Sequence, residues 1–267
     1  MFIALVLAAG CRGSPAAAPD AGVAAAAGTD ATTAPLPANV DWAHVAAAVY
    51  LAGEDYQESK EVDGQLDARR PALLRLLDRA LDSIGQPVAA DADLLQAIRA
   101  LRGRARTSVD YDLPHDAALL SDRIALRAKL PMTPPATPNL AHGAKVYAAA
   151  CAACHGTHAD GHPEISVKLD PPPSDLLHPD RAFRPYDTFA RITYGGLETA
   201  MPGFGDALSV QDRWDVVFYL FAARWPKCDH DVAAMKASTL ALQSDFDLSA
   251  KLPYDAIGCA RQRFAPP

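Results

Sequence analysis

The sequence lacks an excess of positive charge. Its 267 residues include 25 Lys and Arg against 32 Asp and Glu, which gives a formal net charge of −7. Proteins that bind nucleic acid carry a basic stripe opposite the phosphates, so we expect no nucleic-acid partner. The chain also lacks a run of about 18 apolar residues beyond its N-terminus, and this excludes a protein with several membrane-spanning helices.

The sequence also has no segment in which apolar and polar residues alternate as they do in a β-strand. Aromatic residues make up only 7% of the chain, and the 22 prolines outnumber the 16 glycines. No nucleophile and base stand in a catalytic arrangement, so we expect an electron-transfer or binding protein rather than an enzyme. The fold class that we predict is all-α, with helices joined by stiff proline connectors.

The N-terminal segment has the pattern of an export signal. Residues 1–11 form an apolar run that ends in small residues and Cys11, and residues 12–40 are rich in Ala, Pro, Gly and Thr. This order resembles a bacterial lipoprotein signal followed by a disordered tether, which implies that Cys11 carries a lipid anchor. The expected location is then the periplasmic side of a bacterial membrane. The alternative is an ordinary cleaved signal, which would still export the chain.

Four amphipathic stretches follow and predict a helical bundle over residues 41–130. They are Asp41–Glu58, Pro71–Ile84, Asp91–Arg104 and Pro114–Leu130. Asp41 is a candidate N-cap, and Pro71 suits the first turn of its helix. The acidic residues from Glu54 to Asp63 are interpreted as a solvated face, with a metal-binding face as the alternative.

A proline linker separates this bundle from a second helical unit. Residues 131–138 contain four prolines, which cannot continue a helix. We therefore predict a second domain over residues 139–226 and a tail over residues 227–267.

The strongest motif is Cys-Ala-Ala-Cys-His at residues 151–155. Two thiols one helical turn apart can add to the two vinyl groups of one haem, and the adjacent histidine can then bind the iron. We predict one covalent haem c on Cys151 and Cys154, with His155 as an axial ligand. A thioredoxin-like redox pair would need a preceding strand, and a zinc site would need a second cysteine pair.

Met201 is the candidate for the sixth ligand of the iron. It stands in the sequence Met-Pro-Gly-Phe among several glycines, which favours a loop over a core helix. Its thioether sulfur is a soft ligand that stabilises the ferrous state.

These residues resemble class I cytochromes c over about residues 139–224. The resemblance implies that Gly143 and Tyr147 in a first helix meet Val216 and Tyr219 in a last helix. It also implies that a carbonyl of the proline-rich loop at residues 170–173 accepts a hydrogen bond from the axial histidine. We assign this role to Pro172.

The two remaining cysteines, Cys228 and Cys259, are predicted to form a disulfide. An exported protein meets an oxidising compartment, where paired thiols are the default. The alternative is two free thiols.

The expected function is transfer of single electrons outside the cytoplasm, with a membrane redox or iron-transport protein as partner. The order of bundle, proline linker and haem motifs resembles the periplasmic extension of some bacterial high-affinity iron permeases. Residues 50–56 and 62–64 carry part of that resemblance. The alternatives are a respiratory carrier that serves a terminal oxidase, and a haem-based sensor or ligand binder.

Overall fold

The computed structural model describes residues 35–60, 65–86, 88, 90–107, 109–163, 168–169, 171–178, 183–196 and 199–264. Within these ranges the regular secondary structure is helical and contains no strand, so the all-α prediction is confirmed. The expected signal with Cys11, and the tether up to residue 34, lie outside the described residues. None of the described helices combines the length and the hydropathy that a bilayer span requires.

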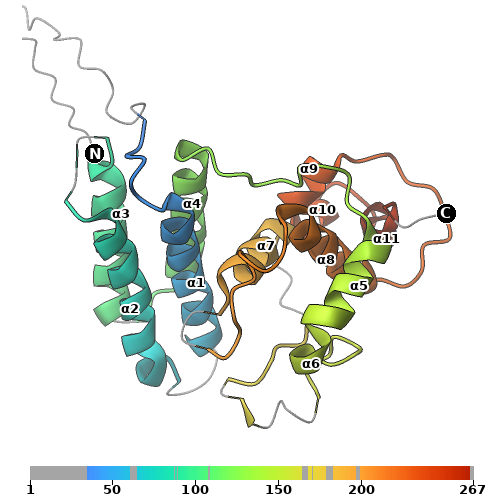
Figure 1. The fold of residues 1–267 in the computed structure, drawn as a ribbon, viewed down its shortest axis with the longest axis horizontal. Coiled ribbons are helices and arrows are strands. Elements are labelled where there is room, and N and C mark those ends of the chain that lie inside the picture. The colour runs from blue at the N-terminus through green and yellow to red at the C-terminus, as the bar shows by residue number, and fades with distance from the viewer. Residues whose placement is uncertain are drawn as a thin grey trace, which may run out of the picture.

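The N-terminal half is a bundle in which α1 packs against α2 and α4, and α3 packs against α2 and α4 (Figure 1). The helices are α1 (Trp42–Lys60), α2 (Gln65–Ile84), α3 (Ala92–Thr107) and α4 (Leu113–Arg127). Apolar side chains from all four helices form one buried cluster. This cluster is the core that the amphipathic stripes predicted.

Helices α1 and α4 approach each other closely because α1 has a glycine where it meets α4. A Cβ on Gly53 would lie 2.5 Å from the Cβ of Ala117, which is too near for any larger residue. The Ser121 hydroxyl of α4 also donates to the Ala46 carbonyl of α1 at 2.9 Å. At the start of α1, the carboxylate of Asp41 accepts a hydrogen bond from the backbone N–H of His44 at 3.0 Å, as expected of an N-cap.

The start of α2 differs from the sequence prediction. The helix begins at Gln65, so Pro71 lies inside it rather than in its first turn. Proline has no N–H to donate to the preceding turn, yet this turn is held by other contacts. Leu66 is buried in the bundle core, and Arg70 binds Asp67 and the carbonyl of Ala105 in α3.

The C-terminal half is a second helical unit built around α8. Its first helices are α5 (Leu140–Ala150), α6 (Ala152–His155), α7 (Pro185–Tyr194) and α8 (Val210–Ala223). α5 crosses α8 at Gly143, where a Cβ would overlap the Asp215 carbonyl and lie 2.9 Å from the Cβ of Tyr219. The rings of Tyr147 and Tyr219 lie 5.8 Å apart beside this crossing. Val216, which the sequence also placed here, is buried.

The segment expected as a tail is part of this second unit. It contains α9 (Ala237–Ala241), α10 (Asp245–Ser249) and α11 (Tyr254–Gln262). Leu240, Leu248 and Ile257 are buried in the same apolar cluster as α8. Cys228 and Cys259 are bonded as a disulfide, which joins the start of this segment to α11.

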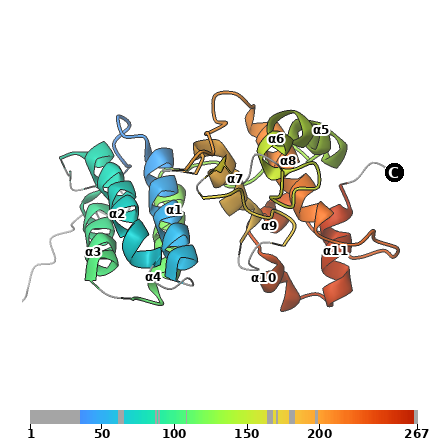
Figure 2. The same cartoon turned by 90° about the horizontal axis from the view of Figure 1, so that it is seen from below.

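The bundle and the second unit meet at α7, which lies beside α1 in both views (Figures 1 and 2). Arg191 of α7 forms an ion pair with Glu54 of α1, and one of its nitrogens lies 3.9 Å from Asp55. The side chains of Glu54 and Asp55 are each only 11% exposed. The prediction of a solvated acidic face is therefore wrong at these two residues, because they face a cation of the other domain.

Candidate haem site

The two thiols of the Cys-Ala-Ala-Cys-His motif are brought together by one helical turn. Cys151 ends α5, and its carbonyl accepts hydrogen bonds from the N–H groups of Cys154 and His155 at 3.1 and 3.0 Å. Both thiols are free. Cys151 is partly buried while Cys154 is exposed, and this burial raises the pKa of the Cys151 thiol to about 11. Two unpaired thiols on one turn can bond to the same flat ring.

The ring of His155 is held in the orientation that a metal ligand needs. Its Nδ1 lies 3.2 Å from the carbonyl oxygen of Ser174. A carbonyl only accepts hydrogen bonds, so Nδ1 carries the proton and Nε2 keeps a lone pair for a metal. Burial lowers the pKa of the imidazole, which favours the neutral form that binds metals.

The accepting carbonyl is two residues beyond the one expected. The sequence assigned it to Pro172, whereas the structure places Ser174 opposite His155. The position of the loop at residues 173–174 explains why Ser174, and not Pro172, faces His155. Gly161, with a φ of +71°, lies so close to this loop that a Cβ would be 2.5 Å from the Pro173 oxygen and 2.9 Å from the carbonyl carbon of Ser174. The sequence shows a glycine there but not which residues it faces.

Met201 lies in a loop that folds back along the end of α7. The backbone N–H of Gly196 donates to the Met201 carbonyl at 3.1 Å, and that of Phe204 donates to the Ile192 carbonyl at 2.9 Å. Gly195, with a φ of +81°, makes the turn, since a Cβ there would lie 2.6 Å from the Met201 oxygen. The loop prediction for Met201 thus matches the backbone that the structure describes.

Met201 and the cysteine motif face the same apolar cluster. The side chains of Met201, Cys151 and Leu176 are partly buried against it. Behind them, Trp214 of α8 is fully buried and stacks on Phe189 of α7 at 4.3 Å between ring centroids. This stack fixes α7, and with it the Met201 loop, on α8.

The donor set of this region fits a haem of the c type. Two free thiols on one turn, a neutral imidazole with its Nε2 lone pair free and a soft thioether on one cluster are the ligands that such a group uses. The other histidines near the motif, His158 and His162, are exposed. Within the described residues, the one cluster of cysteine and histidine elsewhere is Cys228, His230 and Cys259, where the disulfide already occupies both sulfurs.

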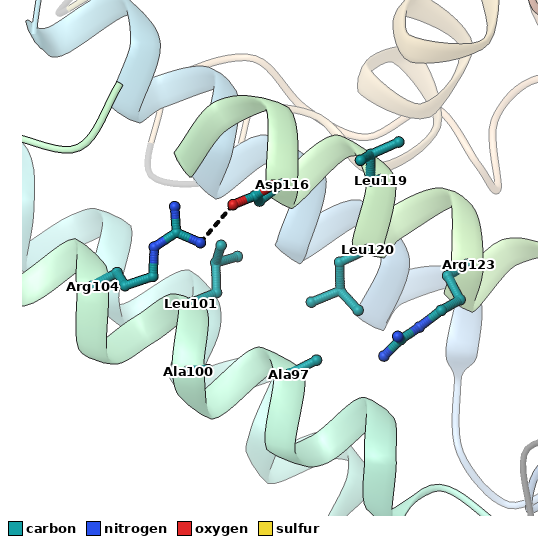
Figure 3. Close-up of a pocket in the computed structure, with 8 residues that line it drawn as sticks. All are labelled: Ala97, Ala100, Leu101, Arg104, Asp116, Leu119, Leu120 and Arg123. Atoms are coloured by element: carbon teal, nitrogen blue, oxygen red, sulfur yellow. Dashed lines mark hydrogen bonds and ion pairs between the residues drawn. The ribbon is translucent and has the colours of Figure 1, made fainter. Parts of the chain in front are cut away.

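A hollow in the bundle is separate from this site. It has a volume of about 340 Å³ and lies between α3 and α4, where Arg104 and Asp116 pair across it at 2.6 Å (Figure 3). Leu101, Leu119 and Leu120 line it. Because its lining contains neither a cysteine nor a histidine, it offers no ligand to a haem.

The Cys-Ala-Ala-Cys-His motif, the His155–Ser174 hydrogen bond and the α5–α8 crossing are features of a c-type cytochrome domain. Residues 138–220 match the family model described as cytochrome C oxidase, cbb3-type, subunit III. Comparisons with curated proteins and with solved structures give no match. The family match supports a haem-containing electron-transfer protein and does not extend over the bundle of α1–α4.

Proposed function

We propose that this chain is a membrane-anchored monohaem c-type cytochrome that passes single electrons. Cys151 and Cys154 would hold the haem covalently, while His155 Nε2 and the sulfur of Met201 would bind its iron. The bound haem supplies a one-electron couple of ferric and ferrous iron. The observation that carries the proposal is the hydrogen bond from His155 Nδ1 to the Ser174 carbonyl, because it leaves Nε2 free next to two unbonded thiols.

The protein's own residues then set how the site behaves. The Ser174 carbonyl orients the imidazole and increases its basicity as a ligand. The thioether of Met201 favours ferrous iron and raises the reduction potential. The apolar cluster against which Met201 and Cys151 pack would keep water from that side of the haem, which would reduce the reorganisation that accompanies each electron.

Optical spectroscopy with a redox titration tests this function. The purified protein should titrate reversibly with one electron, and its ferric form should show the weak long-wavelength absorption band of a methionine-ligated haem. Met201→Ala should remove the band and lower the potential. A wild-type protein without the band would instead support the sensor or ligand-binding alternative, in which the sixth position is open.

The proposed location is the periplasmic side of a bacterial membrane. Cytochrome c domains are typically extracytoplasmic, and the disulfide suits an oxidising compartment. We propose that Cys11 carries the lipid that anchors the chain. Cys11→Ser should move the protein from the membrane fraction to the soluble periplasmic fraction, and continued membrane association of this variant would contradict a lipid anchor.

The proposed partner is a membrane redox or iron-transport protein. The order of the motifs favours an iron permease, whereas the matched family is described as an oxidase subunit. The alternative of a metal-binding acidic face loses its support at Glu54 and Asp55, because both carboxylates face the guanidinium of Arg191.

Gene deletion separates the two partners. A strain without this protein that loses iron uptake under iron limitation, but consumes oxygen normally, would support the iron permease. Normal iron uptake with slower oxygen consumption would support the terminal oxidase. Complementation with Met201→Ala shows whether either defect depends on the haem.

A further inference from the structure

The bundle contacts the element that presents Met201. α7 carries an arginine at each end, and each arginine pairs with an acidic residue of the bundle. At the N-terminal end, Arg184 binds both oxygens of Asp122 in α4 at 2.6 and 2.9 Å. At the C-terminal end, Arg191 binds Glu54 in α1. The bundle is therefore joined to α7 by two ion pairs, one near each end of the helix.

The ion pair of Arg191 and Glu54 is mostly buried. The side chains of Arg191 and Glu54 are 21% and 11% exposed, and Arg191 Nε lies 3.1 Å from Glu54 Oε2. Tyr50 donates its hydroxyl to the other oxygen of Glu54 at 3.1 Å. Because the carboxylate receives donors from both domains, its position and that of the guanidinium are tightly defined.

Arg191 in turn lies against the Met201 loop. A Cβ built on Gly196 would lie 3.4 Å from Nη1 of Arg191 and 3.4 Å from the Cβ of Met201. The guanidinium of Arg191, the side chain of Met201 and the hydroxyl of Thr199 therefore all lie close to Gly196. Its N–H also donates to the Met201 carbonyl, and Gly195 N–H donates to the Arg191 carbonyl at 2.8 Å.

We propose that Glu54 and Arg191 are positioning residues for the distal methionine, so that the bundle sets how firmly Met201 holds the iron. The hydrogen bonds lead from Glu54 to the Arg191 side chain, from the Arg191 carbonyl to Gly195 N–H, and from the neighbouring Gly196 N–H to the Met201 carbonyl. The inference rests on the proposed role of Met201 as the axial ligand. It gives the bundle a function inside this chain, whichever partner receives the electrons.

Cyanide binding to the ferric haem measures this coupling, because cyanide enters the sixth position only when Met201 leaves it. Glu54→Gln keeps the shape of the side chain and removes its charge, so it should tighten apparent cyanide binding by about tenfold. Arg191→Lys keeps the charge but loses the guanidinium, and it should fall between Glu54→Gln and the wild type.

Asp122→Asn is the matched control. It weakens the other ion pair of the same interface, which lies at the far end of α7 from Met201. Its cyanide affinity should stay within about twofold of the wild type. Equal shifts in Asp122→Asn and Glu54→Gln would overturn the proposal, since the effect would then come from general loosening of the interface.

A Met201→Ala background separates this inference from the proposed ligand. There, Glu54→Gln should have no further effect on cyanide binding, because the ligand that it positions is gone. A wild-type affinity in Glu54→Gln, with a large gain in Met201→Ala, would overturn the positioning role and leave the ligand assignment intact. Unchanged cyanide binding in Met201→Ala would overturn the ligand assignment and the inference together.

Discussion

Glu54 of the bundle and Arg191 of the haem domain form a mostly buried ion pair although 137 residues separate them in the chain. Together with the pair of Asp122 and Arg184, it joins the two domains across α7. A buried pair that loses one member leaves an uncompensated charge, which is strongly destabilising. The bundle is therefore a packed part of the haem protein and more than a spacer.

Gly161→Ala should disturb the hydrogen bond that orients His155, the proposed axial ligand. The new Cβ would meet the carbonyls of residues 173–174 at a positive φ, so we expect the free energy of unfolding to fall by about 1–3 kcal/mol. Displacing the Ser174 carbonyl from His155 Nδ1 should also weaken the imidazole as a donor and raise the reduction potential. Urea unfolding and a redox titration of the holoprotein measure the two effects.

Gly103→Ala is the control for this substitution. Gly103 lies inside α3, and a Cβ there would have no neighbour within 4 Å. Alanine should therefore stabilise the helix by about 0.5–1 kcal/mol and leave the potential unchanged. If both variants behaved alike, the close approach of Gly161 to the Ser174 loop would have no energetic role.

Removing the disulfide should loosen the C-terminal helices. Cys228 and Cys259 are 31 residues apart, so Cys228→Ser with Cys259→Ser should cost about 3 kcal/mol through the entropy of the unfolded chain. The midpoint of urea unfolding should fall to the value that the wild type shows in the presence of a thiol reductant. An unchanged midpoint would mean that the packing of α9–α11 alone holds this segment.

Asp212 should contribute to stability in a pH-dependent way. It lies at the start of α8, where hydrogen bonds from His142 of α5 and from Ser209 lower the pKa of its carboxyl. Because the folded-state pKa is below the unfolded one, the stabilisation is fully present above the unfolded pKa of about 3.9 and is lost as the pH falls through the folded pKa.

Asp212→Asn tests this expectation. The variant should be less stable than the wild type by up to about 1 kcal/mol above pH 5, since the pair is partly exposed. The difference should shrink towards zero as the pH falls below the folded pKa. A difference that does not change with pH would assign the effect to the helix cap and not to the charge of the carboxyl.

The sequence predicts the elements of this fold better than their contacts. The 3.6-residue periodicity of the apolar residues identified the bundle helices, since each buries one stripe. It missed the helices of the C-terminal segment because they are short. The sequence Ser244-x-x-Asp247 could have revealed one of them, since the structure shows a capping box there.

In the candidate site, too, the sequence predicts the residues of the motif but not the contacts that they make. Cys151, Cys154 and His155 could be found from the sequence because haem chemistry needs them adjacent in the chain. The carbonyl of Ser174 could not be assigned, because it depends on loop register and not on residue type. The pair of Glu54 and Arg191 was also missed, since nothing in a local pattern reports a partner 137 residues away.

Mass spectrometry of the denatured protein, purified from a host that matures c-type cytochromes, tests the central claim most directly. The account predicts a single haem that stays attached to the wild-type chain after denaturation. It also predicts that Cys151→Ala with Cys154→Ala abolishes this attachment, while Cys228→Ser with Cys259→Ser preserves it. A wild-type chain without covalent haem, or a Cys151→Ala, Cys154→Ala variant that keeps it, would contradict the account.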